Sequence, residues 1–243
     1  MEFAADIVHC ETLGAVARLT MNRPDARNSL SVAMLDRLHS AIYALGADSR
    51  IHVIVIAANG PGFCAGHDLK ELTAARALPD QGRAFFEDTM AKCARLMQAI
   101  IACPKPVIAQ VHGIATAAGC QLVASCDLAV ATDDARFATP GVNIGLFCST
   151  PMVALSRNVS RKSAMEMLLT GDMISADQAL QFGLVNRVVA SGDLEAEVNS
   201  LADKISAKAP TTLRIGKEAF YQQVEMPMEH AYEYASRVMV ANM

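Results

Sequence analysis

The segment HGIATAAGCQL, residues 112–122, follows an apolar strand predicted over Val107 to Val111 and leads into an apolar helix around Cys120 to Ser125. A second run of small residues, GFCAGHD at 62–68, comes after a strand predicted over Ile51 to Ala57. Both junctions can expose backbone N–H groups, because the first amides of a helix are unpaired and carry partial positive charge. Two such ends that face one point could bind an oxyanion, although a single glycine-rich loop more often only makes a tight turn.

Strands and helices alternate outward from these two loops. An alternating segment from Ala15 to Met21 predicts a strand, and Ser31 can cap a helix whose apolar positions follow the 3.6-residue period up to Leu45. A longer helical pattern runs from Phe86 to Ile101, and a further strand is predicted over Leu128 to Ala131. Strand, loop and helix therefore repeat at least twice, which is typical of an α/β fold.

The C-terminal part of the chain is predicted to be mainly helical. Ser175 and Gln178 have the spacing of a capping box, and one short strand is expected over Leu184 to Val189. The sequence contains no linker, low-complexity tract or repeat of fixed period. We therefore expect one structural domain, with an α/β core over residues 1–190 and a helical region over 191–243.

Composition and charge narrow the class of protein. Of the 243 residues, 52% are hydrophobic and 19% are charged, which suggests a large core and subunit interfaces. The net charge of −4 gives no general attraction for nucleic acid, and no apolar stretch reaches the ~18 residues of a membrane-spanning helix. Seven cysteines without a CxxC pair are typical of reduced core thiols. The beginning, MEFAADIVHC, has no signal-peptide or transit-peptide pattern, so we expect a cytosolic location.

Four ordered motifs make the sequence similar to a known superfamily over essentially its whole length. They are NRP at 22–24 with NSL at 28–30, FCAGHDLKE at 63–71, HGIATAAGCQL at 112–122, and CD at 126–127 followed by FATP at 137–140. In this order they resemble the crotonase, or enoyl-CoA hydratase/isomerase, superfamily. The resemblance implies the ClpP/crotonase fold, a spiral of repeated ββα units with a helical C-terminal region. It also implies an acyl-CoA thioester as substrate or ligand, a homotrimer or hexamer, and no separate cofactor or metal.

The resemblance, carried over position by position, also assigns site residues. The backbone N–H groups of His67 and Ala118 would form the oxyanion hole that holds the thioester carbonyl oxygen. The CoA-binding positions are Ala26, Arg27, Ala65 and Lys70, and the acyl-pocket positions are Thr139, Cys148 and Ser149. Arg27 and Lys70 are cations that could meet phosphate, yet either could equally be a solvated surface residue. For Cys148, packing is favoured over a role as nucleophile, because the sequence places no histidine beside it.

The chain departs from the family pattern where the acid and base should be. Hydratases of the family carry one glutamate at the end of the second loop and another after the F-x-x-P segment, and these positions hold Gln121 and Gly141. A carboxamide exchanges no proton near neutral pH, and glycine has no side chain. His67 is the remaining titratable candidate, although its ring could point away while only its amide acts. One subgroup, the enoyl-CoA hydratase domain-containing protein 3 type, shares both departures and resembles this sequence closely.

Three functions were weighed on these residues. The first is a hydratase/isomerase-like enzyme, of the lyase or isomerase class, that stabilises a thioester enolate in acyl-CoA metabolism. The two missing glutamates argue against standard hydratase activity. The second is a catalytically inactive acyl-CoA-binding pseudoenzyme with a regulatory role, which Gln121 and Gly141 favour. The third, a serine hydrolase on the related ClpP-like fold, lacks a serine in either oxyanion loop. A bacterial, cytoplasmic protein is expected, and the mitochondrial matrix is the alternative for a processed eukaryotic form.

Overall fold

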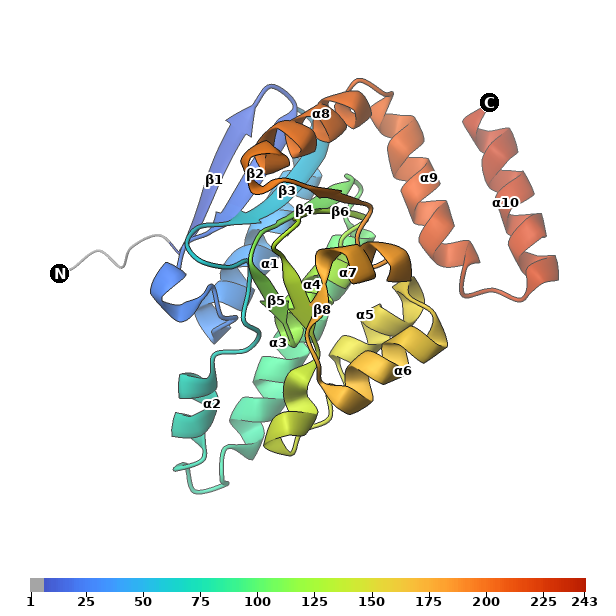
Figure 1. Cartoon of the computed structure of the whole chain (residues 1–243). Helices are drawn as coiled ribbons and strands as arrows, with labels where there is room; N and C mark the ends of the chain where they lie inside the picture. Colours follow the sequence, from blue (N-terminus) through green and yellow to red (C-terminus); the bar gives the residue numbers. More distant parts are fainter. Residues whose placement is uncertain (1–6) are drawn as a thin grey trace.

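The main element of the structure is a six-stranded sheet. The computed structural model describes residues 7–243 (Figure 1). The strands are β1 Val8–Leu13, β2 Val16–Met21, β3 Val53–Ala58, β4 Val107–Val111, β6 Leu128–Thr132 and β9 Arg187–Val189. They lie in the order β1, β2, β3, β4, β6, β9, and only the pair β1 and β2 is antiparallel. The predicted α/β class is confirmed, and β4 has the predicted bounds.

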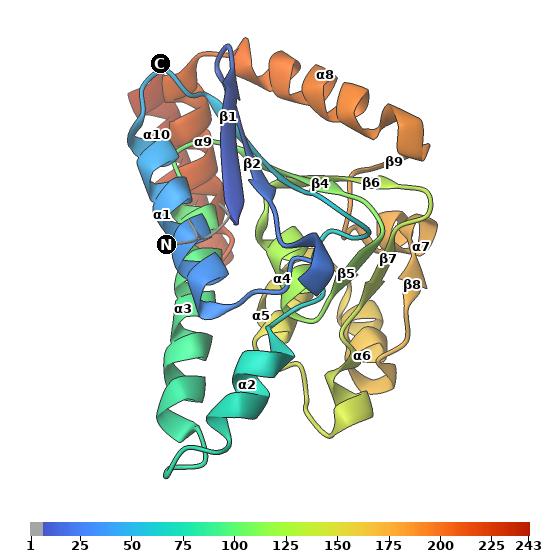
Figure 2. The same cartoon turned by 90° about the vertical axis from the view of Figure 1, so that its left-hand side faces the viewer.

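The central strands of this sheet are buried on both faces. The covering helices are α1 Val32–Ala47, α3 Arg83–Ala102 and α4 Ala118–Ser125 on one side and α8 Leu194–Ser206 on the other (Figure 2). In β3, Val53 and Val55 pack with Val198 of α8, whereas Ile54 and Ile56 belong to the larger cluster on the opposite face. Because successive side chains of a strand point to opposite faces, a strand between two helical layers is apolar throughout. This explains the continuous apolar run VIVIAA at 53–58.

A second, three-stranded sheet supports the loop at 112–122. Its strands are β5 Ile114–Thr116, β7 Arg136–Ala138 and β8 Ile174–Ser175. β5 pairs with β7 in parallel, and β7 pairs with β8 in antiparallel fashion. The sequence predicts residues 113–119 to be a loop between a strand and a helix, whereas 114–116 form β5. The difference has a simple cause, because a three-residue strand is too short to show the alternation that marks longer strands.

The predicted helix caps are present. The Ser31 side chain accepts a hydrogen bond from the N–H of Met34 at 3.2 Å, at the start of α1. Ser175 and Gln178 form the complete capping box of α7, Ala176–Phe182. The short strand expected over 184–189 begins only at Arg187, because the N–H of Leu184 bonds back to the Ala179 carbonyl of α7 at 2.9 Å.

The last two helices form an arm that extends from the rest of the molecule (Figure 1). These are α9 Pro210–Gln223 and α10 Met228–Asn242, and neither contains a buried residue. They pack against each other, whereas α8 lies on the main sheet. The remaining helices are α2 Leu69–Ala75, α5 Pro151–Asn158 and α6 Arg161–Thr170, with short 3-10 helices η1 Pro24–Ala26, η2 Pro140–Ile144 and η3 Ser191–Asp193.

Several expectations from composition can be compared with the structure. All seven cysteines are free thiols, and six of them are buried, with Cys10 exposed. Across residues 7–243, no helix is long and apolar enough to cross a bilayer. The same residues contain no group of three or more side chains placed to hold a metal ion. The expectation about a leader rests on MEFAADIVHC, whose first six residues lie outside those that the structure describes.

Candidate functional site

The two loops singled out in the sequence lie side by side. The N–H of Phe63 donates to the His112 carbonyl at 2.9 Å, and the N–H of Cys64 donates to the Ile114 carbonyl at 3.0 Å. The N–H of Thr116 donates back to the Cys64 carbonyl at 2.9 Å. The first loop is therefore hydrogen-bonded to the edge of β5, so the backbone of each loop fixes the position of the other.

The Asn28 side chain holds the start of the first loop in position by hydrogen bonds. Its side chain is completely buried, and its amide nitrogen donates to the carbonyls of Asn59 and Gly62 at 2.8 and 2.9 Å. Its amide oxygen accepts the N–H of Arg23 at 2.8 Å. The residue adopts a left-handed backbone with φ of 52°, which asparagine tolerates better than most residues. The sequence analysis quoted Asn28 only as part of a motif, and its role in the loop depends on contacts with distant residues.

Asp68 links the end of the first loop to α2. One carboxylate oxygen accepts the N–H of Lys70 at 3.0 Å, which is the predicted helix cap, and the other accepts from the Arg23 guanidinium at 2.9 Å. Burial favours the neutral acid, but the hydrogen bonds from Arg23 and Lys70 outweigh it and lower the pKa of Asp68 below its ordinary value. Asp68 is thus an ionised structural residue that orients the backbone directly after His67.

The backbone N–H groups of His67 and Ala118 have no hydrogen-bond acceptor within residues 7–243. Residues on either side of His67 pair with Leu30, which directs the His67 N–H away from that strand-like contact. Ala118 is the first residue of α4, where helical amides are unpaired. A Cβ atom placed on Gly66 would lie 3.4 Å from the Ala118 nitrogen. With ordinary bond lengths, the nitrogens of His67 and Ala118 are therefore no more than about 7 Å apart.

Ala117 turns the chain into α4 through an unusual backbone conformation. Its φ is 50° and its ψ is −118°, a region that residues with a side chain seldom occupy. The N–H of Ala117 donates to the Ala138 carbonyl of β7 at 2.9 Å, so the small sheet holds the residue in place. This strained turn places the Ala118 nitrogen, the first of α4, beside Gly66 of the first loop.

The His67 ring is partly buried beside these amides. Its Nε2 atom is fully buried and has no hydrogen-bond partner in the described chain. Burial lowers the pKa of His67 to about 4, so the imidazole is neutral at physiological pH. A neutral imidazole with this pKa can donate or accept a hydrogen bond, but it is a weak base for proton abstraction.

Known proteins resemble this chain over nearly its whole length. The model of the enoyl-CoA hydratase/isomerase family matches residues 11–242. This chain belongs to the enoyl-CoA hydratase/isomerase family. A crystal structure of an enoyl-CoA hydratase from Mycobacterium smegmatis aligns with a TM-score of 0.93 and 53% identity, over 98% of this chain and 91% of that one.

Proteins named enoyl-CoA hydratase domain-containing protein 3, mitochondrial, are also similar. The mouse protein is 49% identical over 94% of this chain and 74% of its own length. The crystal structure of the human protein aligns with a TM-score of 0.92 and 46% identity, over 97% of this chain and 91% of that one. The predicted superfamily, subgroup likeness and ClpP/crotonase fold are therefore confirmed.

Gln121 takes the first of the two positions where the family resemblance leads one to expect a glutamate. It lies in the first turns of α4, is 5% exposed, and its amide oxygen is 3.9 Å from the Cys93 sulfur of α3. Its amide nitrogen has no acceptor among the side chains and carbonyls of residues 7–243. The side chain therefore faces α3 and can offer a hydrogen bond, but it cannot supply a titratable proton.

Gly141 takes the second such position, and the backbone folds closely over it. A Cβ atom at Gly141 would lie 2.4 Å from the Leu146 carbonyl oxygen and 2.9 Å from the Cys148 sulfur. The N–H of Leu146 also donates to the Gly141 carbonyl at 2.9 Å. Burial raises the pKa of the Cys148 thiol, and the nearby N–H of Gly141 opposes this only partly. The space beside Gly141 thus contains the backbone of residues 146–148 and a neutral thiol.

The expected CoA-binding residues fall in two groups. The N–H of Ala65 donates to the Arg27 carbonyl at 3.0 Å, which brings these two residues together with Ala26, the last residue of η1. The Ala65 carbonyl accepts from the Thr116 hydroxyl at 3.1 Å. Lys70 is separate, in the first turn of α2, and both Arg27 and Lys70 are exposed. Two cations on adjoining segments therefore face solvent near the first loop.

The remaining acyl-pocket positions differ in what they offer. Thr139 is completely buried, and its hydroxyl donates to the Met167 carbonyl at 2.9 Å. Ser149 is exposed, and its hydroxyl is 3.4 Å from the Phe147 carbonyl. The Thr139 hydroxyl is thus committed to a structural hydrogen bond, whereas the Ser149 hydroxyl remains accessible.

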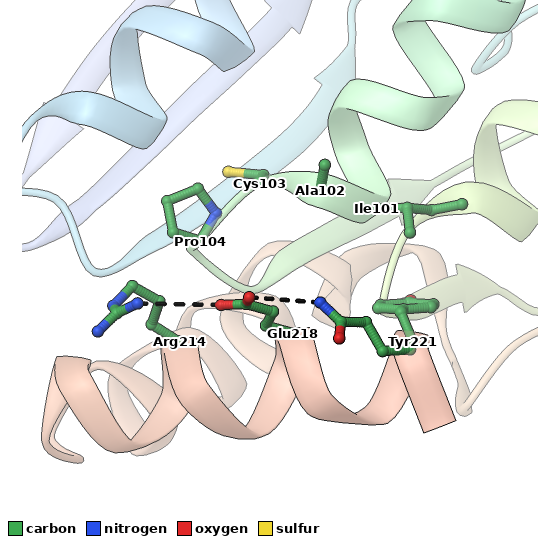
Figure 3. A pocket seen from close by; sticks show the side chains of 8 residues that line it. Ile101, Ala102, Cys103, Pro104, Arg214, Glu218 and Tyr221 are labelled. Atoms are coloured by element: carbon green, nitrogen blue, oxygen red, sulfur yellow. Dashed lines mark hydrogen bonds and ion pairs between the residues drawn. The ribbon is translucent and has the colours of Figure 1, made fainter. Parts of the chain in front are cut away.

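A cavity of about 440 Å³ lies elsewhere, between the end of α3 and the arm helix α9 (Figure 3). Its polar side chains come from α9, where Glu218 lies between Arg214 and Gln222 (Figure 3). Ile101 of this cavity is eight residues beyond Cys93 along α3, which corresponds to about 12 Å. The cavity is therefore a feature of the contact with the arm and is separate from the two loops.

Proposed function

We propose that this protein binds acyl-CoA thioesters and holds the thioester carbonyl oxygen between the backbone N–H groups of His67 and Ala118. The proposal rests on two backbone N–H groups that have no acceptor in the described chain. They lie where the two hydrogen-bonded loops meet, and their nitrogens are no more than about 7 Å apart. Such donors stabilise an enolate oxygen because they are aligned before charge develops there. One donor of this kind is typically worth about 3 to 4 kcal/mol of transition-state stabilisation.

Residues on both sides of the proposed oxyanion hole would bind the two ends of the substrate. Arg27 and Lys70 are exposed cations close to the first loop, where phosphate groups of CoA can bind them. The acyl group would extend toward Cys148 and Ser149, next to Gly141. Acyl-CoA would therefore be the substrate itself, with no additional cofactor needed for enolate chemistry.

Ordinary water addition is not part of the proposal. Gln121 has a carboxamide, Gly141 has no side chain, and the pKa of His67 is lowered to about 4 by burial. None of these groups matches the pKa near neutrality that suits a general acid or base. We therefore propose a hydratase/isomerase-like protein whose chemistry is enolate stabilisation in acyl-CoA metabolism.

A second candidate function is acyl-CoA binding without turnover, with a regulatory role. The close approach of the Leu146 carbonyl to Gly141 favours it, because this backbone contact leaves no room for an acidic side chain at that position. In this case the protein would sequester or sense thioesters, and the same amides would bind the carbonyl oxygen.

Two measurements separate these functions. Isothermal titration with butyryl-CoA and with its thioether analogue S-butyl-CoA tests the hole, because the analogue lacks only the carbonyl oxygen. We expect the thioether to bind at least tenfold more weakly, and equal affinity would contradict the proposed hole. Mass-spectrometric detection of deuterium uptake at the α-carbon in D₂O, together with a crotonyl-CoA hydration assay, then distinguishes turnover from binding alone.

A backbone variant tests the Ala118 donor directly. Ala118→Pro removes the N–H at the first position of α4, where proline fits a helix. We expect a loss of the preference for butyryl-CoA over S-butyl-CoA. Ala176→Pro makes the same change at the first position of α7 and should keep the preference. Circular dichroism checks that both variants fold, and the two-ligand comparison in the wild-type protein stands even if Ala118→Pro does not.

We also propose that the arm is covered by further copies of the chain in a homotrimer or hexamer. Phe220, Val224, Tyr232 and Val240 are large apolar or aromatic residues of α9 and α10, and all are more than half exposed. Patches of this kind normally mark interfaces. Tyr232→Glu should lower the mass measured by sedimentation velocity, and an unchanged mass would show that this face is not an interface.

The cellular location is likewise proposed. The likeness to a Mycobacterium smegmatis structure supports a bacterial, cytoplasmic protein, whereas the names of the animal relatives support the mitochondrial matrix. We favour the cytoplasm. Fractionation of the source cells with an antibody against the chain tests this.

A further inference from the structure

A cavity of about 80 Å³ lies where the helices α4 and α5 end, beside the segment that connects α7 to β9. It is much smaller than the cavity under the arm, and nearly all of the atoms that face it are polar. A water molecule occupies about 30 Å³ in the liquid, so this space is large enough for one small ion with a water molecule or two. Which polar atoms face it decides what it can bind.

Hydrogen bonds hold the walls of this cavity together. The Asn158 amide nitrogen, at the end of α5, donates to the Ala124 carbonyl of α4 at 2.8 Å. The Asn186 amide oxygen accepts the N–H of Ala129 at 2.8 Å, and the N–H of Asn186 donates to the Ala129 carbonyl at 2.8 Å. A Cβ atom placed on Gly183 would lie 3.4 Å from the Asn158 carbonyl oxygen. The segments around the cavity are therefore fixed relative to one another.

Most N–H donors around the cavity are already in use. The N–H groups of Cys126, Gly183 and Leu184 donate to carbonyls at distances of 2.9 to 3.1 Å. The Asn158 amide nitrogen donates to two carbonyls at 2.8 Å each. The Asn186 amide nitrogen, by contrast, has no acceptor within residues 7–243. The cavity is thus poor in free donors.

The oxygen atoms of the same residues are in the opposite state. The carbonyls of Cys126, Gly183 and Leu184 accept no hydrogen bond within residues 7–243, and neither oxygen of Asn158 does. The last carbonyls of a helix have no partner within it and carry partial negative charge. Gly183 and Leu184 have no polar side chain, so the polar atoms that they present to the cavity belong to the main chain. Free acceptors therefore outnumber free donors.

The carboxylate beside the cavity adds no net charge to it. Asp127 also lines the cavity, but one of its oxygens accepts from the Lys217 ammonium at 2.7 Å and the other accepts from the Tyr221 hydroxyl at 2.9 Å. Ca²⁺ and Mg²⁺ are usually bound in proteins through carboxylates that remain charged. Rings of neutral carbonyl oxygens instead replace the hydration shell of ions such as K⁺. The chemistry of this cavity therefore suits a monovalent cation.

We propose that this cavity binds a monovalent cation, K⁺, Na⁺ or ammonium, through the carbonyl oxygens of Cys126, Gly183 and Leu184 and the free oxygens of Asn158. The ion would hold the end of α4 against the end of α5 and against the segment before β9. α4 begins at Ala118 and has eight residues, which corresponds to about 12 Å. The ion therefore lies at the opposite end of α4 from the proposed oxyanion hole, and its binding does not depend on the proposed function.

The first test compares chloride salts at equal ionic strength. The thermal midpoint of the wild-type protein is measured in KCl, NaCl, ammonium chloride and tetramethylammonium chloride. The methyl groups of tetramethylammonium keep its charge away from the carbonyls. We expect a midpoint at least about 2 °C higher with one of the small cations, and a shift that saturates with concentration. The cation that acts at the lowest concentration is the preferred ligand. Equal midpoints in all four salts would contradict the proposal.

The second test locates the ion. Thallium(I) replaces K⁺ in sites built from carbonyl oxygens and scatters X-rays anomalously, so crystals soaked in thallium(I) acetate report its position. We expect an anomalous peak in the cavity, next to the carbonyls of Cys126, Gly183 and Leu184. A cavity that contains only water molecules in such crystals would overturn the proposal.

A variant assigns the thermal shift to this cavity. Asn186→Asp keeps an oxygen for the N–H of Ala129 and replaces the free amide nitrogen with a charged oxygen. We expect the cation concentration at half of the shift to fall at least about tenfold. Asn242→Asp, at the exposed end of α10, is the matched control and should leave that concentration unchanged.

Two further outcomes complete the test. An unchanged half-shift concentration in folded Asn186→Asp would show that the cation acts at another site. Circular dichroism checks the fold of the variant, and the salt comparison and the thallium crystals of the wild-type protein decide the question if Asn186→Asp does not fold.

Discussion

Where the two loops meet, main-chain hydrogen bonds join residues 63 and 64 to residues 112–116, and the buried side chain of Asn28 holds the first loop in position. The arm of α9 and α10 is attached differently, because it is joined to the rest of the molecule largely by polar side chains of α9. The Lys217 ammonium of α9 pairs with Asp127 at 2.7 Å and donates to two carbonyls, and the Tyr221 hydroxyl donates to Asp127 at 2.9 Å.

The contrast shows which parts of the molecule tolerate change in sequence. Where the two loops meet, the groups proposed to bind a ligand are backbone amides. A change of side chain at His67, Ala117 or Ala118 therefore leaves these N–H donors in place. At the arm, the attachment depends on the identity of Lys217 and Asp127. A substitution should therefore act on shape and specificity in the first region and on attachment in the second.

The largest effect on stability is expected from a substitution that removes the hydrogen bonds of Asn28 to the first loop. Asn28→Ala removes three buried hydrogen bonds and leaves the Asn59 and Gly62 carbonyls without this donor, at a cost of about 4 kcal/mol in the free energy of unfolding. Urea denaturation measures this change. Asn59→Ala, which alters an exposed side chain, should cost less than about 1 kcal/mol. Similar losses for both variants would contradict the role given to Asn28.

The next effect concerns the arm. Lys217→Met leaves Asp127 without its cation, in a pair whose side chains are 8% and 16% exposed, and should weaken docking of α9 by about 3 kcal/mol. Hydrogen exchange should speed up in α9 and α10 while β3 and β4 stay protected. Lys208→Met, at an exposed position before α9, serves as the control. Uniform loss of protection over the whole chain would show that the arm is not a separate unit of stability.

A smaller effect depends on pH and on His67. A histidine titrates near 6.5 in an unfolded chain, and burial lowers the pKa of His67 to about 4 in the folded state. Between these values the unfolded state binds a proton that the folded state rejects, so stability falls as the pH drops. From pH 7 to pH 5 this contribution amounts to about 2 kcal/mol.

The measurement compares wild type with His67→Gln by denaturation at both pH values. The variant should lose about 2 kcal/mol less than wild type over this range. His230→Gln, which replaces an exposed histidine of α10, should follow the wild type. Parallel losses in wild type and His67→Gln would mean that the ring is not buried in its neutral form.

The smallest effect is a gain in stability. Ala117→Gly relieves a backbone with φ of 50° that glycine adopts without strain, and should raise the free energy of unfolding by about 1 kcal/mol. The same substitution at an exposed position in the middle of α3, Ala91→Gly, should lower it by about 1 kcal/mol. Opposite signs in urea denaturation would support the strained turn, and a loss at both positions would contradict it.

Much of the framework could be predicted because it follows local rules. The strand from Val107 to Val111, the cap at Ser31 and the capping box at Ser175 depend on residues that are close in sequence. The two loops were identified for the same reason, since runs of small residues between a strand and a helix are visible in any single sequence. The family motifs then suggested which amides to consider.

Other features depend on contacts across the chain and leave little trace in a sequence. The pair of Lys217 and Asp127 joins residues 90 positions apart, and β5 is too short for a pattern. The sequence does show that Thr89 places a hydroxyl on an otherwise apolar helix face between Phe86 and Cys93. That this buried hydroxyl has no partner in the described chain is visible only in three dimensions.

The loop over Gly141 also affects how this branch of the family can change. A carboxylate at position 141 cannot be gained by exchanging one residue, because the Leu146 carbonyl would be 2.4 Å from the new Cβ atom. The stretch from 141 to 146, closed by its own hydrogen bond, would have to be rebuilt beforehand or in the same step. An acidic residue at position 141 therefore needs several coordinated mutations, and no single exchange on the present backbone can introduce it.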